Sequence, residues 1–129
     1  MVTILSPLDH VTVTPSDFKK SLAFYDTVLA TLGLSRIASG EDYCGFGEDR
    51  AFFWLGAPDK DHLKSSAVHL AFSASTQEQV KAFHKAGLNA GGANNGSPGY
   101  REEYDPGYYA SFILDPDGNN IEVVYRESH

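Results

Sequence analysis

The amino-acid sequence predicts an α+β fold in which two βαβββ modules form curled sheets around one cleft. A strand-like hexamer with a histidine in third position opens each half of the chain, at residues 8–13 and 67–72. A helical segment follows each hexamer, and short strand-like segments follow each helix. We expect a single domain over residues 1–129, with a first module at about 5–58 and a second at about 65–126.

The first module begins with β-branched residues at positions 11–13, which favour a strand. Ser16 or Asp17 can cap the helix that follows. Its apolar side chains recur every three or four positions and form one face, made of Phe18, Leu22, Tyr25, Leu29 and Leu32. Gly33 stands where a helix ends on glycine. Within residues 35–57, the segment RAFFWLG is the clearest strand.

The second module repeats this order. Ser75 and Glu78 make a capping-box pattern, and the helix they start is expected to end near Gly87. Residues 89–98 are rich in Gly and Asn and predict a mobile loop. The glycines at 45, 47, 91, 92, 96 and 99 are interpreted as turn residues. Two strands are expected at 108–114 and 121–125, joined by the turn sequence DPDGN.

The two halves are related by a constant offset. His10 and His69 lie 59 positions apart, and the same offset relates further pairs, namely Ser16 and Ser75, Phe24 and Phe83, Leu29 and Leu88, and Gly33 and Gly92. The pattern predicts an internal duplication. The alternative is a coincidence between two ordinary strand–helix units.

Composition excludes several classes of function. The formal net charge is −7 and the ten Lys and Arg residues form no dense cluster, which argues against a nucleic-acid partner. No apolar run is long enough to span a membrane, and no signal peptide is recognised. The single cysteine, Cys44, has no partner for a disulfide or a thiolate metal site, and it fits a reducing, cytoplasmic setting.

Three polar residues interrupt the predicted strands: His10, His69 and Glu122. An ionised carboxylate is costly to bury in such a run unless something compensates its charge. A divalent cation does so, and two imidazoles with one carboxylate leave coordination positions open. For each histidine alone, a hydrogen-bonded core or rim position is the commoner outcome. Glu122 alone is compatible with a solvent-exposed edge strand.

Residues 8–34 and the segment SFILDPDGNNIEVV resemble the vicinal oxygen chelate superfamily, which includes glyoxalase I, bleomycin-resistance proteins, fosfomycin-modifying enzymes and extradiol dioxygenases. The resemblance runs from Leu8 to Tyr125 and is greatest to a glyoxalase-like subgroup with a PGYYA segment, here residues 106–110. It implies paired βαβββ modules, a homodimer with sites often shared between subunits, and a divalent metal (Fe, Mn, Ni, Co or Zn). His10, His69 and Glu122 match its metal ligands.

One position departs from glyoxalase I, which carries a glutamate on the last strand of its first module. The alignment places Trp54 or a neighbour there, and no acidic residue occupies positions 51–55. A fourth protein ligand is therefore missing, so lactoylglutathione lyase activity is not expected. The three-ligand set is more similar to the fosfomycin-modifying and dioxygenase branches.

Further candidates surround this set. Trp54 and Tyr109 are candidates for a substrate pocket, where an indole can stack on a flat ligand, although Trp54 fits a core position equally well. Tyr104, Tyr108 and Arg101 are candidate catalytic residues that orient substrate, since tyrosine donates to an oxyanion and arginine binds a carboxylate. The alternative is a loop that packs its aromatic side chains over the cleft mouth. His84 is expected on the surface of its helix.

The sequence leaves the reaction open between lyase, isomerase and dioxygenase chemistry on a small molecule that presents two adjacent oxygens to the metal. The alternative is a metal-free protein of the bleomycin-resistance kind that sequesters a small molecule. A member that keeps the ligands but has lost activity is a third possibility.

Overall fold

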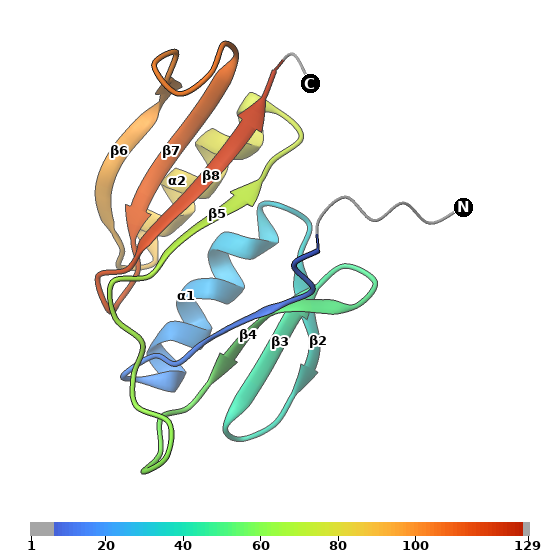
Figure 1. Cartoon of the computed structure of the whole chain (residues 1–129), viewed down its shortest axis with the longest axis vertical. Helices are drawn as coiled ribbons and strands as arrows, with labels where there is room; N and C mark the ends of the chain where they lie inside the picture. Colours follow the sequence, from blue (N-terminus) through green and yellow to red (C-terminus); the bar gives the residue numbers. More distant parts are fainter. Residues whose placement is uncertain (1–6, 128–129) are drawn as a thin grey trace.

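The computed structural model describes residues 7–127 as two four-stranded mixed sheets, each with one helix (Figure 1). The first half of the chain contains β1 (Val11–Val13), α1 (Phe18–Ala30), β2 (Ser35–Ser39), β3 (Tyr43–Gly47) and β4 (Ala51–Gly56). The second half contains β5 (His69–Ser73), α2 (Gln77–Asn89), β6 (Ala93–Tyr100), β7 (Tyr108–Leu114) and β8 (Asn120–Arg126). The predicted α+β class with two βαβββ units is confirmed.

Both sheets have the same topology. The strand order is β1-β4-β3-β2 in the first and β5-β8-β7-β6 in the second. In each sheet the first strand runs parallel to the last, and the other pairs are antiparallel. Within residues 7–127 each strand pairs only inside its own half, so the sheets do not close around a common cleft in one chain. Figure 1 shows the two sheets one above the other.

The helices lie on one face of each sheet and pack against each other between the two halves. A single apolar core runs through both halves: the ring of Phe53 lies 4.9 Å from that of Tyr25 and 5.4 Å from that of Phe72. Phe53 and Phe83 are fully buried, and each such side chain contributes about 1.5–3 kcal/mol by leaving water. No helix of the described chain is long and apolar enough to cross a membrane.

The helix ends follow from local chemistry. The Asp17 side chain accepts a hydrogen bond from the Lys20 amide and caps α1, as predicted for one of its two candidate caps. Gly33 has a φ of +77°, and the Leu34 amide donates to the Leu29 carbonyl, which closes α1. The cap of α2 is Thr76 rather than Ser75, because the Thr76 side chain accepts from the Gln79 amide.

Three expectations are wrong, and they concern a loop of the second half, four glycines and His84. Most of the predicted loop at residues 89–98 is strand β6, whose backbone pairs with β7 through bulges. Four glycines interpreted as turns lie in strands instead, Gly45 and Gly47 in β3 and Gly96 and Gly99 in β6. His84, which was expected on the surface, is buried against β6, and its Nε2 lies 2.9 Å from the Asn94 Oδ1.

The turn between β7 and β8 connects the two halves. The Tyr25 hydroxyl on α1 donates to the buried Asp115 carboxylate at 2.6 Å. Asp115 also accepts from the Asp117 amide and from the amide and side chain of Asn119. The Ser16 amide and hydroxyl donate to Asp117. The DPDGN turn therefore holds the start of β8 against the first half.

Candidate functional site

We call the face of each sheet that is turned away from its helix its outer face. On the outer face of the second sheet, His69 Nε2 lies 2.9 Å from Glu122 Oε1, and the Tyr108 hydroxyl donates to Glu122 Oε2. The Glu122 side chain is 4% exposed and the His69 side chain 53% exposed. A buried carboxylate is thus held between an imidazole at the surface and a phenol.

Strand register explains this cluster. Ala71 pairs with Glu122 across the parallel β5–β8 ladder, and Phe112 pairs with Glu122 across β7–β8. Side chains alternate between faces, so His69, two residues before Ala71, projects on the same side as Glu122. Ser111 and Ile113 project on the helix side, where the Ser111 hydroxyl donates to the Val80 carbonyl of α2.

Tyr108 is a firm hydrogen-bond donor. Burial is the main cause that raises the pKa of Tyr108 to about 12, and the hydrogen bond to Glu122 is the second. The hydroxyl therefore stays protonated near neutral pH. The Arg126 guanidinium lies 4.8 Å from the centre of the Tyr108 ring, and the Tyr104 ring meets it edge-on at 5.3 Å. These contacts fix the phenol beside Glu122.

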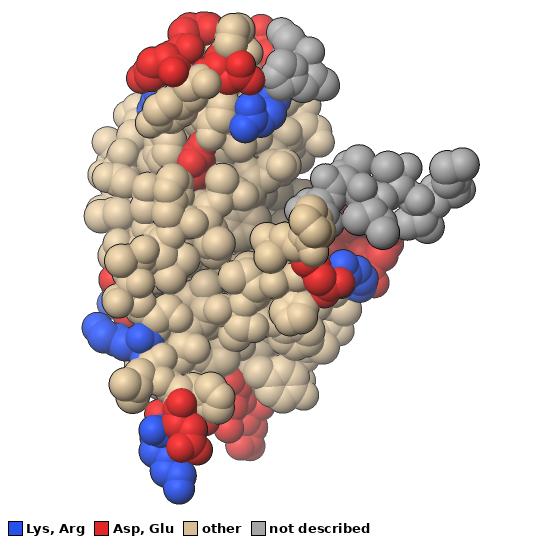
Figure 2. All heavy atoms as spheres, viewed as in Figure 1, with Lys and Arg blue, Asp and Glu red and all other residues tan. Residues whose placement is uncertain are grey.

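Next to this cluster, Ala110, Phe112 and Val124 form an apolar patch on the same outer face. The guanidinium of Arg101 lies 5.3 Å from the centre of the Phe112 ring, and the His69 ring lies 6.5 Å from it on another side. Figure 2, which shares the view of Figure 1, shows mostly uncharged residues over β7 and β8, with most charged side chains at the margins of the view.

The outer face of the first sheet carries Trp54 at the corresponding position. Thr12 pairs with Trp54 as Ala71 pairs with Glu122, which agrees with the sequence alignment. The Trp54 ring covers Gly45: a Cβ atom on Gly45 would lie 2.6 Å from the Trp54 Cζ3. Tyr43 lies beside it, with ring centres 6.4 Å apart. At the position that carries the Glu122 carboxylate in the second sheet, the first sheet therefore carries the Trp54 indole, which packs over Gly45.

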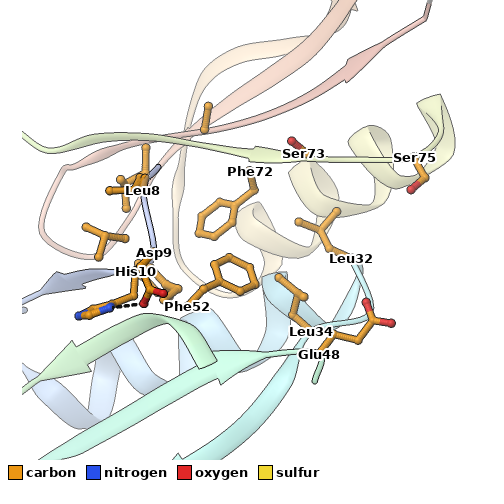
Figure 3. A pocket seen from close by; sticks show the side chains of 14 residues that line it. Leu8, Asp9, His10, Leu32, Leu34, Glu48, Phe52, Phe72, Ser73 and Ser75 are labelled. Carbon is orange, nitrogen blue, oxygen red and sulfur yellow. Dashed lines mark hydrogen bonds and ion pairs between the residues drawn. The ribbon is translucent and has the colours of Figure 1, made fainter. Parts of the chain in front are cut away.

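His10 lies directly before β1, and its Nδ1 is 2.7 Å from Asp9 Oδ1. The hydrogen bonds from His10 and then Arg50 hold the pKa of Asp9 below its usual range. His10 lies at the rim of a pocket of about 520 Å³ between the two halves, which also includes Phe52, Phe72 and Ser73 (Figure 3). Figure 3 shows the His10 ring turned away from the two phenylalanines.

The structure thus brings together part of the predicted set. His69, Glu122 and Tyr108 touch on one face, with Arg101 beyond Phe112. His10 and Trp54 belong to the other sheet, and residues 7–127 contain no group of three or more His, Cys, Asp and Glu side chains that could hold a metal ion.

The two remaining candidates do not touch Glu122: Tyr109 faces the other side of the sheet, and the Tyr104 ring lies against the Tyr108 ring instead. Tyr109 projects to the helix side and is buried in the core, so it does not line this face. Tyr104 is 60% exposed in the loop before β7. Phe112, which sequence reasoning missed, is the cross-strand neighbour of Glu122, and only the register reveals it.

Comparisons with known proteins agree with this architecture. A glyoxalase/bleomycin resistance protein from Albidiferax ferrireducens T118 superposes with a TM-score of 0.83 at 31% identity, covering 94% of this chain and 100% of that chain. A glyoxalase/bleomycin resistance protein/dioxygenase family enzyme from Burkholderia phytofirmans PsJN has a TM-score of 0.73 at 19% identity, covering 94% and 99%.

A lactoylglutathione lyase from Agrobacterium tumefaciens has a TM-score of 0.69 at 20% identity, covering 95% of each chain, and shows likeness of fold alone. Comparison with curated proteins finds no match. Residues 7–123 match the family model of this group. The chain therefore belongs to the Glyoxalase/Bleomycin resistance protein/Dioxygenase superfamily.

Proposed function

We propose that the protein is a divalent-metal-dependent enzyme that acts on a small molecule presenting two adjacent oxygens. The observation that carries this proposal is the Glu122 carboxylate, buried on a sheet face that no helix covers. Burying a carboxylate costs several kcal/mol unless its charge is matched. His69 and Glu122 supply an imidazole nitrogen and a carboxylate oxygen from neighbouring parallel strands, a donor set that suits a divalent ion.

The third ligand in this proposal is His10 of a second copy of the chain. His10 lies directly before β1 and two residues before Thr12, so continued strand alternation would place it on the outer face that carries Trp54. Its side chain is 55% exposed and its ring is turned from the pocket. A homodimer that places the first sheet of one copy against the second sheet of the other joins His10 to the His69–Glu122 pair.

In this arrangement, some residues of the chain orient the metal ligands and others contact the substrate. The Tyr108 hydroxyl holds Glu122 Oε2, which leaves Oε1 and His69 Nε2 to face a ligand. Trp54 of the second copy offers a flat apolar wall. When bound, the divalent ion supplies Lewis acidity toward the two adjacent oxygens. Lyase, isomerase and dioxygenase reactions all remain compatible with this arrangement, and no further residue selects among them.

Metal content tests the proposal. We expect protein purified without chelator to bind about one divalent ion per chain, and His10→Ala, His69→Ala and Glu122→Gln each to abolish that binding. His62→Ala is the matched control, because His62 is exposed and bonds only the nearby Asp59. Wild-type protein that stays empty with added iron, manganese, nickel, cobalt and zinc would refute the metal site.

Mixing two variants tests the shared site. A dimer of His10→Ala chains or of Glu122→Gln chains lacks one ligand at both of its sites. In a mixed dimer, one of the two sites keeps His10 from the Glu122→Gln chain and His69 with Glu122 from the His10→Ala chain. We expect the mixture, unfolded and refolded together, to regain about one ion per mixed dimer. Mixtures that bind no more metal than either variant alone would show that each site lies within one chain.

A metal-free small-molecule-binding protein of the bleomycin-resistance type is the second candidate. It is favoured by the pocket of about 520 Å³ between the halves, whose lining includes Phe52, Phe53 and Phe72. Ligand binding that is unchanged by chelator and by Glu122→Gln, and lost when the pocket is filled by Leu34→Trp, would favour this function over the enzyme.

A further inference from the structure

Arg101 is the one arginine of the chain that has no carboxylate partner in the described structure. Arg36 pairs with Asp26, Arg50 with Asp9 and Arg126 with Asp105. Arg101 instead donates from Nη1 to the Gly99 carbonyl at 3.0 Å and from Nη2 to the Ser97 carbonyl at 2.8 Å. In a protein of net charge −7, an arginine held this way keeps its full positive charge available.

Two glycines make room for this guanidinium. A Cβ atom on Gly99 would lie 3.3 Å from Arg101 Nη1, and one on Gly96 would lie 3.2 Å from Nη2 and 2.7 Å from Phe112 Cδ1. Gly96 pairs with Phe112 and Gly99 with Ala110, so both lie on the outer face of the second sheet. The Arg101 side chain therefore turns back over β6 and lies flat across two positions that carry no side chain.

The Arg101 guanidinium is held in place, but not all of its N–H donors are engaged in hydrogen bonds. It has five N–H donors, of which the two carbonyls engage two, so three remain for a ligand. The Phe112 ring lies against it and, on another side, near the His69 ring. One apolar ring thus separates a fixed cation from the His69–Glu122 pair, on the same face of the sheet.

We propose that Arg101 is an anion-binding residue that receives the carboxylate of a small organic acid whose apolar body packs beside the edge of Phe112. A planar guanidinium binds a carboxylate through two parallel hydrogen bonds, and its prior fixation lowers the entropy lost on binding. Combined with the proposed function, on which this extension rests, the substrate carries a carboxylate in addition to its two adjacent oxygens.

The test uses benzoate, its neutral isostere benzamide, and inorganic phosphate, each titrated into metal-free, isotope-labelled protein and followed by NMR. We expect benzoate to bind with shifts centred on β6 and Phe112, and benzamide to bind at least about tenfold more weakly, since a charge-assisted pair is lost. Arg101→Gln should weaken benzoate about tenfold or more, and Arg101→Lys by less. Arg36→Gln is the matched control and should bind as wild type.

Gly99→Ala adds a variant that keeps the charge but shifts the guanidinium by a few tenths of an ångström, and it should weaken benzoate by less than Arg101→Gln does while the spectrum remains folded. Equal binding of benzoate and benzamide, or equal losses in Arg101→Gln and Arg36→Gln, would overturn the proposal. Tighter binding of phosphate than of benzoate would overturn the carboxylate assignment. Because no metal is present, failure of the metal site leaves this result unaffected, and the reverse also holds.

Discussion

The two halves share one topology but differ at corresponding positions of their outer faces. In the second half, Glu122 lies beside Phe112 and bonds to His69 and Tyr108. In the first half, Trp54 stands at the position of Glu122 and Gly45 at the position of Phe112. The Trp54 indole covers Gly45, which has no side chain. The two halves therefore share an apolar helix-facing side, while the outer faces differ in carrying a carboxylate in one half and an indole in the other.

The difference extends to the turn before each last strand. In the second half, the Asp115 carboxylate accepts four hydrogen bonds and reaches α1 through Tyr25. In the first half, the turn at residues 48–50 is exposed, and Arg50 bonds to Asp9 at the surface. The start of β8, the strand that carries Glu122, is thus held by hydrogen bonds to the first half, whereas the position of Trp54 depends on packing.

The largest effect is expected from breaking the second turn. Asp115→Ala removes a 5% exposed carboxylate and leaves the Tyr25 hydroxyl and the Asn119 amide without their acceptor. We expect a loss of about 3 kcal/mol in the free energy of unfolding, measured in urea. Asp49→Ala in the first turn should change it by less than about 0.5 kcal/mol. Equal losses in the two variants would mean that the turns are equivalent.

The next effect concerns the phenol that holds Glu122. Tyr108→Phe should weaken metal binding about tenfold, since a group that orients a ligand typically contributes that much to affinity. Tyr43→Phe, which changes an exposed tyrosine on the other outer face, should leave the affinity unchanged. Calorimetric titration with zinc measures both. An unchanged affinity in Tyr108→Phe would remove Tyr108 from the site.

A smaller effect is expected where Trp54 covers β3. Gly45→Ala places a Cβ atom 2.6 Å from the Trp54 ring, so the indole must move. We expect a cost of about 1–2 kcal/mol and a change in fluorescence, which reports this side chain alone because the chain has one tryptophan. Gly56→Ala is the control, since its Cβ would lie 3.8 Å from Thr12. Identical spectra for both variants would contradict the close contact.

The smallest effect lies on the helix-facing side, where Cys44 corresponds to Ser111 by register. Cys44 is fully buried, and burial raises the pKa of its thiol. Less thiolate is present at pH 8 than in an exposed cysteine, so we expect slow reaction with an aromatic disulfide reagent and full reaction in urea. Rapid labelling of the folded protein would show that the first sheet opens readily.

Sequence patterns predicted the elements that depend on local chemistry. The Asp17 cap, the glycine after α1 and the DPDGN turn each follow from neighbouring residues. Strand β6 was missed because Gly96 and Gly99 indicate turns, whereas their role is to leave room for Arg101. That role depends on a side chain that folds back from two residues or more along the chain, which no local pattern encodes.

The site was predictable only in part, for a similar reason. Offset and alternation identified His69 and Glu122 as candidates, and they lie together. Tyr108 and Tyr109 are adjacent, so they project to opposite faces, and only strand register decides which one meets Glu122. His10 lies directly before β1 in the other half, apart from the His69–Glu122 pair within the described chain, because an offset between two histidines does not decide how far apart the two sheets place them.

The separation of strand pairing into two halves has a consequence for how such proteins diversify. Among residues 7–127 no strand ladder crosses the connection at 57–68, and the halves meet through contacts such as Phe53 with Phe72 and Tyr25 with Asp115. A genetic crossover in that connection would interrupt no sheet and would need to preserve only a few core partners. Recombination there can therefore combine halves with different outer faces wherever the core residues that both halves share still fit.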